Sequence, residues 1–73
     1  MANDNGLDIR AEVVGLLLEK VTSDTYPSGT MLDMIELLAS PEERDTYAQV
    51  LMDKVMSNKY PSIPMMRRLL ALS

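Results

Sequence analysis

Apolar residues recur along most of the chain at the three- and four-residue spacing of amphipathic helices. Short polar stretches that contain proline or serine separate four such segments. This pattern predicts an all-α fold of four short helices. The segments run from Ile9 to about Ser23–Thr25, from about Gly29 to Leu38, from Pro41 to about Ser57, and from about Ile63 to the C-terminus.

Residues that favour helix starts precede each segment, because their side-chain oxygens can accept hydrogen bonds from the first free amides. The third start is the strongest: after Ser40, Pro41 suits the first helical position and Glu43 completes a capping box. Pro27 ends the first helix because it disfavours the helical conformation at Tyr26. The predicted capping residues are Asp8, Ser28, Ser40 and Ser62.

The sequence repeats itself at an offset of 34 residues, most visibly where Tyr26-Pro27-Ser28 recurs as Tyr60-Pro61-Ser62. We therefore predict two tandem helical hairpins, at about 8–39 and about 40–73, packed as one small bundle over 8–73. Residues 1–7 are expected to be a flexible N-terminus. Comparing 10–39 with 44–73 gives ten identities, at Arg10, Leu17, Lys20, Val21, Ser23, Tyr26, Pro27, Ser28, Met31 and Leu38.

The length and the amino-acid composition of the chain limit the chemistry that it can perform. A chain of 73 residues buries only about 60% of its unfolded surface, so its core alone is marginal. Cysteine and histidine are absent, which removes disulfides, thiol catalysis and the commonest metal ligand and general base. We therefore expect no enzymatic activity, no cofactor and no metal site. A protein partner or self-association is the expected source of further stability.

The charge of the chain argues against two other partners. A net charge of −4 has the wrong sign for holding phosphate backbones, and Arg67 and Arg68 are too few to reverse it. No apolar run approaches the roughly 18 residues needed to cross a bilayer. The N-terminus carries acid rather than the basic start of a signal peptide. We expect no nucleic-acid binding, no membrane contact and no secretion.

Equivalent positions of the second and fourth helices differ in charge. Asp33 and Glu36 are matched by Arg67 and Leu70, and Arg68 stands beside them. Two interpretations remain open. The opposite charges pair within one molecule as ordinary surface ion pairs, or the acidic face of one copy meets the basic face of another in a head-to-tail oligomer.

The predicted partner-binding surface centres on the fourth helix, with an acidic patch on the second helix as its complement. The two tyrosines of the repeat either plug the hairpin corners or form a docking surface. The methionines either fill gaps in the core or line an adaptable groove. The candidate residues are Met65, Met66, Arg67, Arg68, Leu69 and Leu70, with Asp33 and Glu36 opposite them, and Tyr26 and Tyr60 at the corners.

The signature K-V-x-S-x-x-Y-P-S-x-x-M, present at 20–31 and again at 54–65, resembles short helical proteins of tailed bacteriophages of actinobacteria. Those proteins are encoded among virion-structure and assembly genes and have no assigned activity. The resemblance implies a small virion component or assembly factor, found in the virion or the host cytoplasm. The alternative is a small acidic phage protein that binds and inhibits a host protein.

Overall fold

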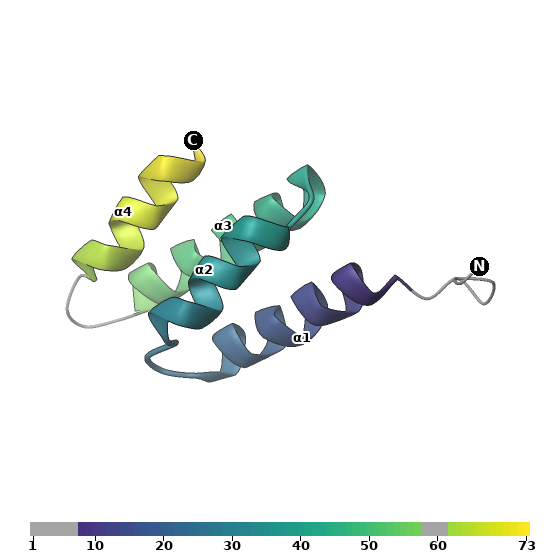
Figure 1. Ribbon diagram of the computed structural model, residues 1–73. Helices are drawn as coiled ribbons and strands as arrows, with labels where there is room; N and C mark the ends of the chain where they lie inside the picture. The colour runs from purple at the N-terminus through teal and green to yellow at the C-terminus, as the bar shows by residue number, and fades with distance from the viewer. Residues whose placement is uncertain (1–7, 58–61) are drawn as a thin grey trace.

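The computed structural model describes residues 8–57 and 62–73, which form four α-helices and no strand (Figure 1). Residues 1–7 and the second corner, with Tyr60 and Pro61, lie outside the described residues. The all-α prediction is therefore confirmed for this part of the chain. The helices are α1 (Ile9–Ser23), α2 (Gly29–Leu38), α3 (Pro41–Ser57) and α4 (Ile63–Leu72).

The predicted helix starts are formed as hydrogen-bonded caps. The Ser28 hydroxyl accepts from the amide of Met31 at 3.2 Å, and the Ser62 hydroxyl accepts from the amide of Met65 at 3.4 Å. These two caps occupy equivalent positions of the sequence repeat. Asp8 caps α1 in the same way, through the amide of Ala11. Each cap satisfies one of the donors that a helix start leaves free.

The start of α3 also ties three helices together. The Ser40 hydroxyl accepts from the Glu43 amide at 3.2 Å, and the Glu43 carboxylate accepts from the Ser40 amide at 2.8 Å, as in the predicted capping box. The same carboxylate forms an ion pair with Arg10 of α1. Arg10 also donates to the carbonyl of Leu38, at the end of α2, at 2.8 Å. The hydrogen bond from Arg10, followed by that from the Ser40 amide, lowers the pKa of Glu43.

The helices are packed unequally. α1 lies against α2 and α3, and α3 also lies against α2 and α4. Among the described helices, α4 has close backbone contact with α3 alone, so α1 and α4 occupy opposite flanks of the molecule (Figure 1). The second flank is consequently held by fewer contacts than the first.

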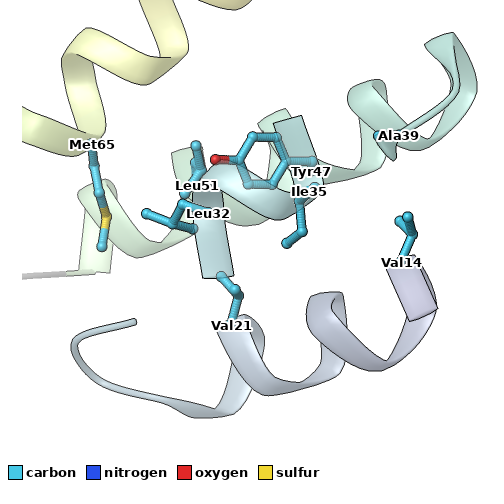
Figure 2. Close-up of a cluster of buried hydrophobic side chains, with 8 residues drawn as sticks. All are labelled: Val14, Val21, Leu32, Ile35, Ala39, Tyr47, Leu51 and Met65. Carbon is cyan, nitrogen blue, oxygen red and sulfur yellow. The ribbon is translucent and has the colours of Figure 1, made fainter. Parts of the chain in front are cut away.

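A cluster of buried side chains, with members on all four helices, forms the core (Figure 2). Tyr47 is the largest fully buried residue and lies near its centre, in a chain that has neither Phe nor Trp. Burial of side chains of this kind supplies about 1.5–3 kcal/mol each. The buried residues are Val14, Val21, Leu32, Ile35, Ala39, Tyr47, Leu51 and Met65.

The apolar sequence of α2 predicts a largely covered helix, and this expectation is wrong, because Leu37 is 81% exposed and Met34 is also exposed. On α4, Leu70 is 73% exposed, so this residue of the predicted partner-binding surface is accessible. Four short helices offer too little neighbouring surface to cover every apolar side chain, so the apolar residues outside the buried core are partly covered or lie in solvent.

Gly15 lies inside α1, where a glycine either lets another helix approach closely or is a mild surface defect. Among the described residues nothing approaches it, because a Cβ atom added at Gly15 would meet no atom within 4 Å. The glycine is exposed in the middle of α1, in ordinary helical backbone. Its destabilising effect on the helix is therefore not offset by a contact with any residue that the structure describes.

The substitution Gly15→Ala is expected to raise the free energy of unfolding by about 1 kcal/mol. Alanine loses less backbone conformational entropy than glycine when the helix forms, and its added Cβ atom would meet no described atom within 4 Å. Urea unfolding followed by far-UV circular dichroism measures the difference. A loss of stability would show that the glycine is required by a contact within the folded chain.

The pKa of Glu43 predicts a pH dependence of stability. Because the folded pKa lies below the ordinary value of 4.5, the carboxylate stabilises the fold above that pH, and this contribution is lost as the pH falls through the folded pKa. Glu43→Gln is therefore expected to be less stable than the wild type at pH 7, with the difference shrinking in acid. Glu42→Gln, which makes the same charge change outside this network, is the control. A difference between Glu43→Gln and wild type that is independent of pH would contradict the assignment.

Candidate interaction surface

Arg68 connects α4 to α2, although the backbones of these two helices are not in close contact. Its Nη1 atom lies 2.8 Å from Oδ1 of Asp33 and 2.9 Å from Oε2 of Glu36. The opposite charges of the two helices are thus paired within one chain. Arg68 and Glu36 are both partly buried, whereas the Asp33 side chain is largely exposed. The bond to Glu36 is therefore the better shielded of the two.

Glu36 also joins this pair to the core, because its Oε2 atom accepts a short hydrogen bond from the hydroxyl of Tyr47. Burial, and then the hydrogen bond to Glu36, raises the pKa of Tyr47. Hydrogen bonds to Glu36 and Asp33 raise the pKa of Arg68. At neutral pH the phenol is therefore a donor and the guanidinium is charged, so the carboxylate receives hydrogen bonds from two helices at once.

This network and the core occupy several of the residues predicted to bind a partner. Met65 is buried, and Leu69 packs against the core as a partly buried side chain. Asp33 and Glu36, the proposed acceptors for a second copy, are the partners of Arg68 in the same chain. These residues hold the fold together in the isolated chain.

The remaining candidates on α4 face outward. Arg67 and Leu70 are exposed and Met66 is partly exposed. The described residues provide no ion-pair partner for Arg67. The fourth helix therefore divides into an inner face, used for folding, and an outer face of mixed apolar and basic character.

The first hairpin corner leaves its aromatic ring in solvent. Tyr26 is 85% exposed, so it does not plug the corner. It borders a shallow pocket between the first corner and the start of α4. Tyr60, its counterpart, lies outside the described residues. The pocket is lined by Tyr26, Pro27, Gly29, Leu32, Ser62, Pro64, Met65 and Arg68.

A wider apolar groove between α1 and α3, here called the α1/α3 groove, was not predicted. The hydrophobic pattern assigns Leu16 and Leu18 to the buried stripe of α1, but Leu16 is 62% exposed on the groove wall. Gly15 is one of the lining residues of the groove, and the space beside it is open. Its lining residues are Gly15, Leu16, Leu18, Glu19, Lys20, Thr22, Ser23, Thr46 and Val50.

Two other kinds of site are absent from residues 8–57 and 62–73. None of the described helices combines the length and the apolar character that a membrane span requires. Nor do the described side chains contain a group of three or more acidic, histidine or cysteine residues placed to hold a metal ion.

No family model, curated protein or solved structure matches the chain.

A double-mutant cycle tests whether Arg68 and Glu36 interact within one chain. For Arg68→Met and Glu36→Gln we expect a coupling free energy of about 1 kcal/mol in the free energy of unfolding, independent of protein concentration. The matched cycle with Arg67→Met and Glu36→Gln is expected to give none, because Arg67 points outward. Coupling that appears only in concentrated protein would show that the pair forms between copies.

Proposed function

We propose that this protein is a non-enzymatic protein–protein interaction module. The observation that carries the proposal is that many large apolar side chains of this small protein are exposed to solvent. Leu37, Leu70 and Tyr26 are each more than 70% exposed. Contiguous exposed apolar surface marks interaction sites in soluble proteins, and here the α1/α3 groove provides such surface, with Leu16, Leu18 and Val50 in its lining. The other exposed large apolar residues in the described part of the chain are Ile9, Leu16, Met34, Met52, Met56 and Ile63.

The exposed side chains are spread over several elements and do not form one enclosed cavity. Leu16 lies in the α1/α3 groove, Leu37 on α2, and Leu70 on the outer face of α4. A small-molecule site would be concave and convergent. Shallow apolar surface with charged neighbours instead favours a macromolecular partner, in which a few buried side chains provide most of the affinity.

Within this proposal, the two halves of the chain are copies of one helical hairpin. Three observations support the duplication: the ten identities, the equivalent caps at Ser28 and Ser62, and the packing of α1 on α2 and of α3 on α4. The copies have diverged in charge, since Arg68 occupies the position equivalent to Met34. One copy thus supplies the acidic partners and the other the basic one.

The biological setting that we propose is the particle of a tailed phage, in which the protein is a minor virion component or an assembly factor. The support for this step is the repeated signature at 20–31 and 54–65, which resembles short phage helical proteins. A role in assembly is also consistent with the exposed apolar side chains, which a partner protein would bury.

Affinity capture tests the interaction function. The full chain is immobilised through an N-terminal tag and exposed to disrupted virions, and retained proteins are identified by mass spectrometry. We expect a defined protein that is lost at least about tenfold with Leu16→Ser, Leu37→Ser or Leu70→Ser, because exposed apolar anchors carry binding energy. Asp45→Asn, a change at an exposed residue without apolar loss, is the control bait. If no protein distinguishes the wild type from any of these variants, the chain does not bind through this surface.

A further inference from the structure

We propose that a second copy of this chain continues the repeat. The first hairpin of that copy (α1 and α2) packs on the second hairpin (α3 and α4) of the first copy, as α3 packs on α1 and α2 within one chain. This inference rests on the proposed function, because it treats the two halves of the chain as copies of one hairpin. It deepens that function by naming the chain itself as a partner, through an interface whose template is already present in each molecule.

The template is the contact between the two hairpins of one chain, where three polar side chains meet. The Glu36 carboxylate of the first hairpin accepts hydrogen bonds from Tyr47 and Arg68, which both belong to the second hairpin. A hairpin thus has two different surfaces. Its receiving surface carries the position of Glu36, and its docking surface carries the positions equivalent to Tyr47 and Arg68.

The receiving surface of the second hairpin has an apolar residue at the central position. At the offset of 34 residues, Leu70 is the equivalent of Glu36. Leu70 is 73% exposed, whereas Glu36 is partly buried by its contacts with the second hairpin. The second hairpin therefore presents a leucine at the place where the first presents a carboxylate.

The docking surface of the first hairpin is apolar at both matching positions. Val13 is the equivalent of Tyr47, and Met34 is the equivalent of Arg68. Met34 is 40% exposed and Val13 is partly exposed. All three members of the triad have thus changed from polar to apolar. A change of one member would leave buried polar groups without partners, whereas the joint change produces an apolar contact.

A lysine occupies the same place in both hairpins and supplies a second match. Lys54 of α3 donates to the carbonyl of Thr22, at the end of α1, at 3.1 Å. Lys20 is its exposed equivalent on α1, and Met56 is the equivalent of Thr22 near the end of α3. In the continued repeat, Lys20 of the second copy donates to the Met56 carbonyl of the first. A cation is stabilising at a helix C-terminus, where carbonyl groups lack helical partners.

The two surfaces cannot meet within one chain. Among the described helices, α4 has close backbone contact with neither α1 nor α2, and α1 and α4 lie on opposite flanks (Figure 1). The contact is therefore heterologous and generates a ring or an open chain of stacked hairpins. Copies that each carry a net charge of −4 repel one another, so added salt strengthens this apolar association.

Sedimentation velocity of the purified full chain tests this inference over a range of protein and salt concentrations. We expect reversible self-association that becomes tighter with added salt. Leu70→Glu is expected to weaken it at least about tenfold, because the new carboxylate would be buried against Val13 and Met34 of the second copy without a partner. Circular dichroism confirms that the variant is folded.

Leu37 provides the matched control. It is 81% exposed although the second hairpin already packs on the first, and its equivalent, Ala71, is exposed as well. The position therefore lies on neither surface. Leu37→Glu, which makes the same chemical change as Leu70→Glu, should associate as the wild type does.

A rescue across two chains identifies the residues that meet. Met34→Arg alone is expected to weaken association, because it places a guanidinium against Leu70. A mixture of Leu70→Glu chains with Met34→Arg chains is expected to associate more tightly than either variant alone. The new carboxylate and guanidinium then pair between copies as Glu36 and Arg68 pair within one. If a charged variant unfolds, Leu70→Ser and Met34→Ser replace the pair, and both are expected to weaken association.

Four results would overturn the inference. They are a wild-type chain that stays monomeric at all concentrations, a folded variant at Leu70 that associates as well as the wild type, a weakening by Leu37→Glu equal to that by Leu70→Glu, and a mixture of folded charged variants no better than its components. The proposed function is judged separately. If the chain stays monomeric but captures a virion protein that a serine variant loses, this inference fails and the interaction function stands.

Discussion

The carboxylate of Glu36 joins three of the four helices. It receives the hydroxyl of Tyr47 from the core on α3 and the guanidinium of Arg68 from α4, while its own backbone belongs to α2. Because α4 has close backbone contact with α3 alone, the reach of Arg68 to Glu36 fixes the rotation of α4 about its axis. Removing either hydrogen bond would leave a partly buried charge with fewer partners, which is costly even where the net gain from the pair is small.

The rotation of α4 about its axis also determines which of its side chains face solvent. With Met65, Arg68 and Leu69 turned inward, the positions at the other side of the helix necessarily face solvent. The internal ion pairs use the acids of α2, so Arg67 stays exposed and has no ion-pair partner among the described residues. The same division holds at the other flank, where Glu43 serves both the capping box and the ion pair with Arg10.

The positions of the helix caps could be predicted from the sequence, because they depend on local chemistry. Which apolar side chains are buried could not be predicted, because burial depends on how much surface the neighbouring helices offer. The caps at Ser28, Ser40 and Ser62 follow from residue type and spacing, and they lie where expected. Apolar spacing did not separate Leu51, which is buried, from Leu16, which is not, because both fit a helical stripe. The partner of Arg68 required knowledge of the distance between helices, which no local pattern contains.

The most direct measurement of the central claim is amide hydrogen exchange, followed helix by helix in the wild type and in Glu36→Gln. Because the Glu36 carboxylate accepts from Tyr47 of α3 and from Arg68 of α4, we expect Glu36→Gln to lower the exchange protection of the amides of α4 more than that of the amides of α1. Glu42→Gln, which makes the same charge change outside this network, should leave both helices as they are in the wild type. An equal loss of protection in α1 and α4, or no loss in α4, would contradict the account.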